Sequence, residues 1–574
     1  MSEENIVEKG NSTPVLDSNI NVNRRLVKEY QNPGPHALNK QQALPTWRLM
    51  LLGLGVSIGL FLSFLDTSIV ATSLVTIGTD FNNVEEVNWV ALAYTLSYLA
   101  FTTVIARISD VVGRRDAFLG SYAVFIATSI GCGFAQNLNQ LIALRAAQGF
   151  GASGLYSLSM IILPEIVPPS WRHILASLIG IIITLASVLG PVLGGVFTRY
   201  AGWRWIFWIN GPIGAVSIIL FFLAWPKPQY LPHSKRLSWR DLDYFGSVLL
   251  VAAAVLVVYP FQSASSSVDQ WSKVTFFVPL TLGLLAWIAI FAWSLFIETR
   301  WGDGIAAAVP MRILRDRVYA SAVVNTMLLG FPYILLIYAF AQRLQVVNGK
   351  DALIAGVMLL PALAASAVGS AISGRINGHK DRAFETLVVA ASSMLLGCGL
   401  LSTVSDSKAV EPKALGFLVF VGFGFGLSVS TSTMIASIRS SAKDHATAQG
   451  IVAQVRVLGG SLGIAATSAI LGATLQSQIG AFVTADEISA LVAGDGIGMD
   501  SNQLTAIRKA YSNAFREDME VCAIISGVAI LSAIGTYSRN RSNWKRMRDG
   551  QTEAGEEYGA ESGSSQHGDR ESLS

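Results

Sequence analysis

The sequence predicts an all-α polytopic membrane protein. Hydrophobic residues make up 52% of the 574 residues and charged residues only 14%, whereas soluble domains carry about 25% charged residues. The mean hydropathy is +0.49, and the apolar residues occur in long uninterrupted blocks. The net charge of +3 is small and dispersed, which argues against a nucleic-acid partner.

Apolar runs of about 20 residues are long enough to cross the bilayer core as helices. The chain contains fourteen such runs, separated by charged or Gly/Pro-rich breaks. An even number of spans places both termini on the same side of the membrane. The predicted spans are 50–74, 88–108, 117–135, 138–163, 174–198, 203–225, 243–261, 274–297, 319–342, 352–374, 384–404, 414–437, 446–475 and 520–537.

Polar tails flank the spans, and we expect residues 1–45 and 539–574 to be disordered. No apolar run followed by a small-residue cleavage site precedes the first span, so we expect no removable signal peptide. With a cytoplasmic N-terminus, the inner loops hold more Lys and Arg than the outer loops. The positive-inside rule therefore predicts that both termini are cytoplasmic.

An internal repeat divides the chain. Arg107 in ARISD corresponds to Arg375 in GRING at an offset of 268 residues, and Gly190 corresponds to Gly459 at an offset of 269. Related halves with a ligand site at their interface are typical of secondary transporters. The predicted parts are a six-helix half at 46–226, a linker with two extra spans at 227–318, and a second six-helix half at 319–538 with a long outer loop at 476–519.

Five motifs follow in order along the spans: LDTSIVATSL from Leu65, ARISDVVGRR from Ala106, LIALRAAQGFGASG from Leu141, GPVLGG from Gly190 and GWRWIFWINGPIG from Gly202. In these motifs the chain resembles the major facilitator superfamily, and within it the fourteen-span drug:proton antiporters, particularly fungal multidrug or toxin efflux pumps. The resemblance covers residues 50 to 540. It implies a major facilitator fold of two six-helix halves with two inserted central helices.

The loop between spans 2 and 3 carries Asp110, Gly113, Arg114 and Arg115, which match the family pattern, while Ala106 stands where Gly is usual. We expect this loop to act as a conformational latch. Asp110 would accept hydrogen bonds from the N-terminus of span 13, where the helix dipole favours an anion. In the alternative reading, the arginines only set the topology.

Asp66 is the only carboxylate predicted to lie well inside an apolar span, and no histidine does. An Asp at a helix centre costs about 2.5–3.5 kcal/mol on insertion scales, so it normally has a function. A carboxyl group withdrawn from water holds a proton more readily. We therefore predict that Asp66 is the proton carrier; the alternative is a capped structural group.

Arg145 lies at a similar depth in span 4, about 6 Å from Asp66 along the membrane normal at 1.5 Å per residue. An electrostatic interaction between the two is therefore expected. The resemblance assigns Arg145 to a span-4 motif linked to proton coupling. The alternative is that its side chain extends to the outer headgroups.

GPVLGG resembles the motif that marks antiporters within the superfamily. Gly190 and Gly194 form a GxxxG face for close helix packing, Pro191 bends the helix, and Gly195 completes the motif. Arg456 is a further costly charge, in span 13. Its role is open between anchoring a substrate carboxyl group and stabilising the interface between the halves.

The resemblance implies that spans 1, 4, 9 and 12 line the cargo cavity. Aromatic side chains there can stack on planar compounds and polar ones can orient them, although most aromatic residues in membranes serve packing. With Asp66 as the single carboxylate, the cavity favours neutral or mixed cargo. The candidate contacts are Trp89, Tyr94, Tyr98, Gln148, Tyr156, Asn325, Tyr338 and Arg456.

We therefore expect a proton-coupled efflux transporter that exports small hydrophobic or amphipathic compounds (drugs, fungal toxins or secondary metabolites) by alternating access. We expect it in the plasma membrane, as a monomer. The alternative is a vacuolar basic amino acid or siderophore transporter of the same superfamily. No HExxH motif indicates a zinc enzyme, and no GxxxxGK[ST] motif indicates an ATP-driven pump. Its partners would be cargo, protons and the bilayer, with no cofactor or metal beyond the proton gradient. The three cysteines are too far apart to predict a disulfide framework.

Overall fold

Long α-helices build the described part of the chain. The computed structural model describes residues 45–81, 83, 86–167, 172–226, 238–264, 273–300, 307–379, 381–440, 444–479 and 501–538. The tails expected to be disordered lie outside these ranges, except for Pro45. All described helices belong to one unit, Thr46–Trp225 with Pro232–Ser574.

The first six predicted spans correspond to helices whose ends are set by charged, Gly or Pro-rich turns. Two of them are interrupted: short helices η1 and α3 continue the first span, and α8 precedes α9. The helices are α2 (Thr46–Ile69), η1 (Val70–Thr72), α3 (Leu74–Asp80), α4 (Asn88–Val112), α5 (Arg114–Gly133), α6 (Leu138–Ile166), α7 (Arg172–Tyr200), α8 (Trp205–Trp208) and α9 (Asn210–Ala224).

The remaining spans also form helices, and the tenth is interrupted between α14 and α15. The inserted pair is α10 (Tyr244–Ala264) and α11 (Val274–Arg300). The second group contains α12 (Met311–Leu314), α13 (Arg317–Val346), α14 (Ala352–Val357), α15 (Leu360–His379), α16 (Ala383–Leu401), α17 (Pro412–Arg439), α18 (His445–Ile479) and α20 (Ser501–Ile534).

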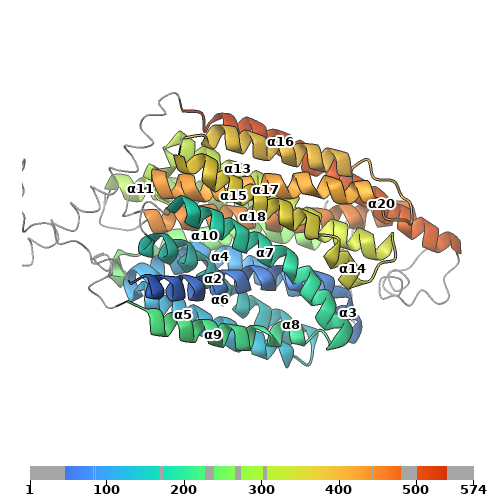
Figure 1. Cartoon of the computed structure of the whole chain (residues 1–574), viewed down its shortest axis with the longest axis horizontal. Coiled ribbons are helices and arrows are strands. Elements are labelled where there is room, and N and C mark those ends of the chain that lie inside the picture. The colour runs from blue at the N-terminus through green and yellow to red at the C-terminus, as the bar shows by residue number, and fades with distance from the viewer. Residues whose placement is uncertain are drawn as a thin grey trace, which may run out of the picture. The chain divides into compact units, whose positions relative to one another are not determined.

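The same packing scheme occurs twice. Helix α2 packs against α7 and α9, as α13 packs against α18 and α20; α4 and α5 pack on α6, as α15 and α16 pack on α17. The two sets meet where α4 contacts α18 and where α7 contacts α15. Figure 1 shows the first set in blue to green and the second in yellow to red. The repeat visible in the sequence is therefore a repeat of structure.

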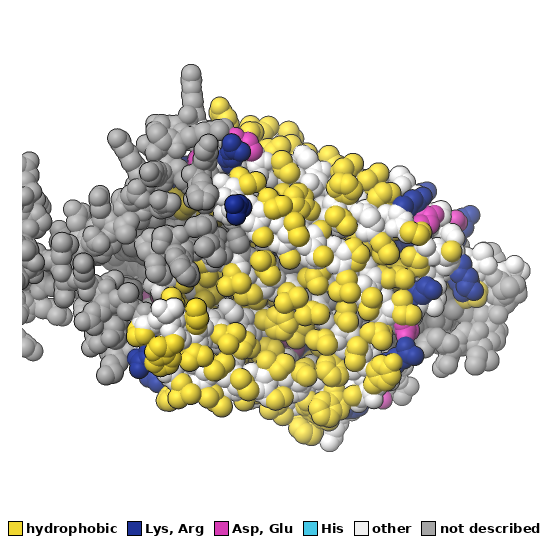
Figure 2. Space-filling model, in the orientation of Figure 1, with side chains coloured by type: hydrophobic (Ala, Val, Ile, Leu, Met, Phe, Trp, Pro, Cys, Tyr) yellow, Lys and Arg dark blue, Asp and Glu magenta, His cyan; other side chains and the backbone are white. Residues whose placement is uncertain are grey.

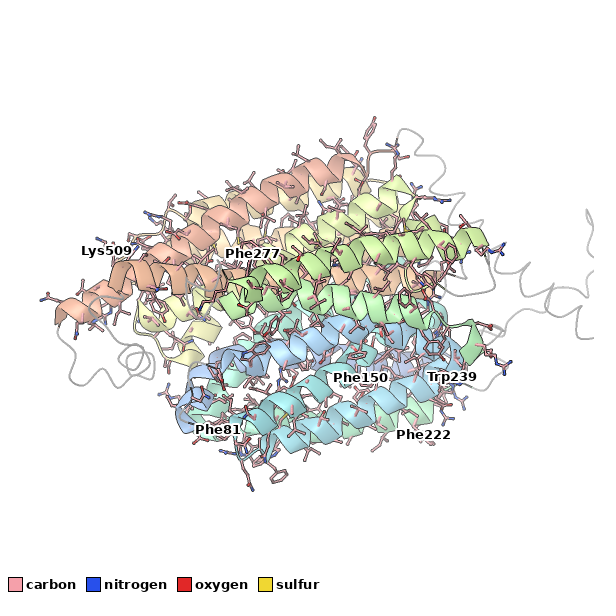
Figure 3. The ribbon with its side chains drawn as sticks, turned by 180° about the vertical axis from the view of Figure 1, so that it is seen from behind. Phe81, Phe150, Phe222, Trp239, Phe277 and Lys509 are labelled. Carbon is pink, nitrogen blue, oxygen red and sulfur yellow. The ribbon has the colours of Figure 1, made fainter. Side chains whose placement is uncertain are left out.

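The inserted helices cover one seam between the halves. Helix α10 packs on α11 and also contacts α4 and α18. Helix α11 turns large apolar side chains outward, among them Phe277, Leu284 and Ile288, and Phe277 is visible on the rear face in Figure 3. An outward face of this composition suits contact with lipid tails.

The surface has the distribution that a bilayer requires. Hydrophobic side chains spread over the middle of the face shown in Figure 2, and charged side chains gather at its two ends. Within the described ranges, thirteen helices are long and apolar enough to cross a membrane. The fourteenth predicted span corresponds to the apolar C-terminal part of α20. That helix fails the same criterion because Glu517, Asp518 and Glu520 precede the apolar residues.

The expected outer loop at 476–519 is wrong at both ends. Helix α18 continues to Ile479 and α20 begins at Ser501, so helix replaces much of the predicted loop. The sequence of the first half of α20 has a polar composition because exposed positions such as Lys509, Arg516 and Glu517 carry charged residues. Its other side packs against α13 and α18, which stabilises the helix beyond the apolar segment.

Candidate functional site

Asp66 lies fully buried in α2 and receives three hydrogen-bond donors. On Oδ1 it accepts from Gln148 Nε2 at 3.0 Å and from Asn210 Nδ2 at 2.8 Å. On Oδ2 it forms an ion pair with Arg145 Nη1. The structure thus brings together the two intramembrane charges that the sequence placed at similar depth.

Arg145, on α6, is also fully buried. Its Nε donates to the carbonyl oxygen of Val90 at 3.0 Å, and Nη1 also donates to Gln148 Oε1 at 2.8 Å. The guanidinium carbon lies 4.1 Å from the ring centroid of Tyr94 and 5.6 Å from that of Phe207. The side chain therefore points into the helical half, and extension to the outer headgroups does not describe this conformation.

N–H donors reach both oxygens of Asp66. A carboxylate only accepts hydrogen bonds, so it is complementary to these donors. Asp66, Arg145, Gln148 and Asn210 therefore form one buried polar network.

Two of these partners were not assigned this role from the sequence. Gln148 was expected to contact cargo, and instead it bridges Arg145 and Asp66. Asn210 was not singled out, although it lies in the GWRWIFWINGPIG motif at the start of α9. Ser129 holds it in place by accepting from its Nδ2 at 3.0 Å. The sequence feature that could have identified Asn210 is its polar side chain next to Gly211 and Pro212 in an apolar span.

The loop between α4 and α5 turns on Gly113, whose φ of +107° is strained for residues with a Cβ. Arg114 Nη1 lies 2.6 Å from Asp110, and Arg107 lies 3.6 Å from the same carboxylate. Arg115 lies over the ring of Phe222 at 5.0 Å. The described ion pairs of Asp110 are thus with arginines of its own half, and the expected contact with the N-terminus of α18 stays a prediction.

Other residues link the halves at this end. Arg107 donates to the carbonyl oxygen of Ala307, in the segment that follows the inserted helices. The next backbone N–H, of Ala308, donates to buried Asp243 at 3.1 Å. Further along this segment, Arg312 pairs with Asp444, which directly precedes α18. Residues 307–312 therefore connect the α4–α5 loop to the start of α18.

The GPVLGG motif lies at a close contact of α7 with α2. A Cβ on Gly190 would lie 2.0 Å from Ser68 Oγ, and one on Gly194 would lie 2.2 Å from the carbonyl oxygen of Ile69. Gly195 is buried beside them. Pro191 faces the other half, since a Cβ on Gly356 of α14 would lie 2.9 Å from its carbonyl group. The motif thus serves contacts within and between the halves.

Several candidate cargo residues form one aromatic group. Tyr94 stacks on Tyr98 at 5.9 Å, and Tyr98 stacks on Tyr156 at 5.6 Å between ring centroids. Arg456 Nη1 donates to the hydroxyl of Tyr156 at 2.8 Å, across the seam between the halves. Tyr338 also crosses this seam, and its hydroxyl donates to the carbonyl oxygen of Thr67 at 3.2 Å.

Two candidates lie elsewhere. The ring of Trp89 packs against Tyr259 of α10 at 5.7 Å, so it contacts the inserted helix. Asn325 donates to the carbonyl oxygen of Ala529 at 2.8 Å, within the second half. The span on which Trp89 or Asn325 lies does not reveal where its side chain points, because each helix packs against several neighbours.

A further carboxylate, Asp518, is deeply buried outside the predicted apolar spans. Asp518 is 2% exposed and accepts from Thr467 Oγ1 at 2.6 Å. The prediction missed it because it placed Asp518 in a loop before the last span, whereas α20 begins at Ser501. Asp243 and Asp444, at the same end of the helices as the α4–α5 loop, are buried too.

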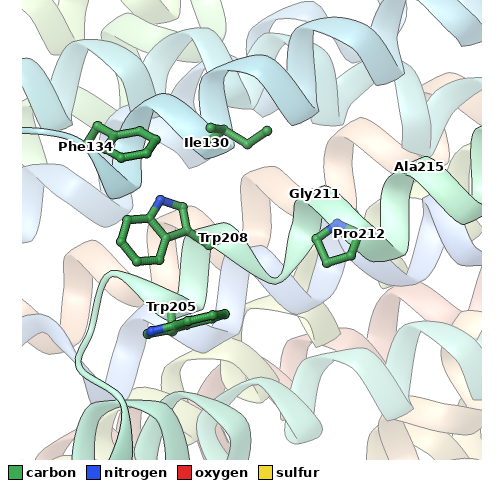
Figure 4. Close-up of a pocket in the computed structure, with 7 residues that line it drawn as sticks. All are labelled: Ile130, Phe134, Trp205, Trp208, Gly211, Pro212 and Ala215. Carbon is green, nitrogen blue, oxygen red and sulfur yellow. The ribbon is translucent and has the colours of Figure 1, made fainter.

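A groove of about 580 Å³ lies away from these residues. Its apolar lining comes from the end of α5 and from α8 and α9, as Figure 4 shows for Phe134, Trp205 and Trp208. Phe134 is 69% exposed and Trp205 is 46% exposed. The groove therefore opens on the outer surface of the helices and does not lead to Asp66.

Comparison with known proteins gives consistent matches. The family model described as Major Facilitator Superfamily matches residues 56–464. The chain is 31% identical to the MFS-type transporter FPY5 of Fusarium mangiferae, over 86% of this chain and 85% of that protein. It is also 31% identical to the efflux pump FUS6 of Gibberella fujikuroi, over 74% and 75%.

Among solved structures, a bacterial homologue of the human lysosomal transporter Spinster, in an inward-facing and unoccupied conformation, has a similar fold. The TM-score is 0.55 at 16% identity, covering 86% of this chain and 99% of that one. This similarity concerns the fold alone.

Proposed function

Because this chain belongs to the major facilitator superfamily, and is thus a multi-pass integral membrane transporter, we propose that it is a proton-coupled exporter of small hydrophobic or amphipathic organic compounds. Drugs, fungal toxins and secondary metabolites are the proposed cargo class. Relatives named as efflux pumps support export. Alternating access of the two halves is the proposed mechanism.

The observation that carries the proton coupling is the buried charge network around Asp66. A carboxylate with three donors is stable when ionised, and it binds a proton only when that network rearranges. Protonation and conformation are therefore linked, which is what an antiporter needs. Arg145 is the natural moving part because it carries the compensating charge.

The α4–α5 loop supplies the proposed latch. Asp110 fixes Arg114 and Arg107, and Arg107 in turn reaches Ala307 in the segment that leads to α18. These contacts hold the halves together at this end, so they must break when that end opens. On the positive-inside rule this end is cytoplasmic, as are both termini. The plasma membrane is the proposed location, because it is the membrane across which export leaves the cell.

The test is transport into inside-out vesicles with an imposed pH gradient, acidic inside. The probes are ethidium, a planar cation, and 2-naphthoate, a planar anion. The proposal expects accumulation of at least one probe that collapses with a protonophore and in Asp66→Asn. Asp406→Asn, which changes an exposed carboxylate in the α16–α17 loop, serves as the matched control and should retain transport. Accumulation that is equal with and without the gradient would overturn proton coupling.

A further inference from the structure

The described partners of the buried cation Arg456 are both hydroxyl groups. It lies on α18 and is 4% exposed. Its Nη1 donates to Tyr156 at 2.8 Å and Nη2 donates to Ser432 Oγ at 3.4 Å. Its Nε–H is buried and meets no acceptor among the residues that the structure describes.

The other buried arginines have stronger acceptors. Arg145 pairs with Asp66, and Arg107 lies beside Asp110. Arg343 donates to the carbonyl oxygen of Ser405 at 2.6 Å, next to the acidic α16–α17 loop. Within the described part of the chain, no carboxylate pairs with Arg456. A charge withdrawn from water without a counter-charge is costly, so its presence at the seam calls for a ligand that supplies one.

The surroundings of Arg456 indicate the rest of that ligand. Tyr156, which it contacts, stacks on Tyr98 with an interplanar angle of 15°. Phe64 packs edge-on against the same Tyr156 ring at 5.1 Å. These rings come from α2, α4 and α6 of the first half, while Arg456 and Ser432 come from the second. The site thus combines aromatic faces on one side with a cation on the other.

We propose that Arg456 binds the carboxylate of an aromatic organic acid whose ring packs against Tyr98, Tyr156 and Phe64. An arginine fork matches a carboxylate with two parallel hydrogen bonds, and Arg456 has an N–H to spare. The inference rests on the proposed export function and narrows its cargo to organic anions, whereas the single Asp66 suggested neutral or mixed cargo. Because both halves contribute side chains to this site, cargo binding would also stabilise the conformation in which the two halves are in contact there.

The experiment measures equilibrium binding to the purified full-length protein in lipid nanodiscs, without any gradient. The probes are 2-naphthoate and 2-naphthamide, which share the ring and differ in charge. A charge-assisted hydrogen bond predicts that the carboxylate binds roughly ten-fold or more tighter than the amide. Equal affinity of the two probes for the wild type, or no binding of naphthoate at millimolar concentration, would overturn the proposal.

Variants separate a ligand contact from a structural one. Arg456→Gln should remove the preference for naphthoate and leave the affinity for naphthamide unchanged, while Arg456→Lys should keep part of it. Equal loss for both probes would mean that Arg456 only joins the halves. Arg343→Gln, which removes another buried arginine of the second half, should keep the preference. If Arg456→Gln does not fold, the affinities of the wild type for naphthoate and naphthamide still test the proposal.

The outcome is independent of proton coupling. Asp66→Asn should lose gradient-driven transport yet still prefer naphthoate over naphthamide. If the wild type shows no gradient-driven transport but still prefers naphthoate over naphthamide, only the proposed export mechanism is rejected. Intact transport of ethidium without any preference would reject the anion site alone.

Discussion

Replacing Arg145 with Ala should destabilise the first helical half. The side chain supplies one of the three donors to Asp66 and its positively charged partner. Removing one partner of a buried ion pair costs about 3–5 kcal/mol, because the other charge stays buried without compensation. Gln148 and Asn210 still donate to Asp66, so we expect a loss of unfolding free energy near the lower end of this range.

Chemical unfolding of the purified protein, followed by the loss of helical circular dichroism, measures this loss. Arg145→Lys should be intermediate between the wild type and Arg145→Ala, since it keeps the charge but loses the planar fork. Arg204→Ala, which breaks the half-exposed pair with Asp80, is the control and should cost no more than about 1 kcal/mol. An unfolding free energy of Arg145→Ala within about 1 kcal/mol of the wild type would refute the ion pair with Asp66 as a stabilising contact.

Three further changes test the same account. Asp66→Asn should abolish proton-coupled export at normal membrane levels, because Asn cannot exchange a proton; wild-type resistance in cells that express it would reject the carrier assignment. Asp110→Lys should slow exchange more than it weakens cargo binding, since it repels Arg114 and Arg107; normal exchange with weaker binding would contradict the latch. Gly194→Val should cost about 1–3 kcal/mol by separating α7 from α2, seen as a lower thermal midpoint, whereas Gly120→Ala meets nothing within 4 Å and should be neutral.

The helices were largely predictable because the bilayer imposes a simple rule. A helix needs about 17–25 predominantly apolar residues to cross it, so hydropathy locates most of the spans. The rule failed at α20, whose outer half is stabilised by α13 and α18 and not by lipid. Hydropathy reports only the part of a helix that lipid surrounds, so the helical first half of α20 was assigned to a loop.

The site was predictable only at residues whose side chains cost much free energy to insert into the membrane. Asp66, Arg145 and Arg456 stand out because a charge in an apolar span requires a reason. The neutral side chains of Gln148 and Asn210 cost less free energy to insert into the membrane. Their role depends on which neighbouring helix each of them faces. The link from Arg107 to Ala307 joins residues 200 positions apart, and no local pattern encodes such a contact.

Arg145 and Arg456 lie at opposite ends of one aromatic stack. Arg145 covers the face of Tyr94, the rings of Tyr94, Tyr98 and Tyr156 follow in series, and Tyr156 accepts a hydrogen bond from Arg456. If Asp66 carries the proton and Arg456 holds the cargo, as proposed above, this stack is a packed connection between the two sites. Because tightly packed rings shift together and not singly, Tyr98→Leu should then weaken gradient-driven transport while leaving both charges, and the preference for naphthoate over naphthamide, in place.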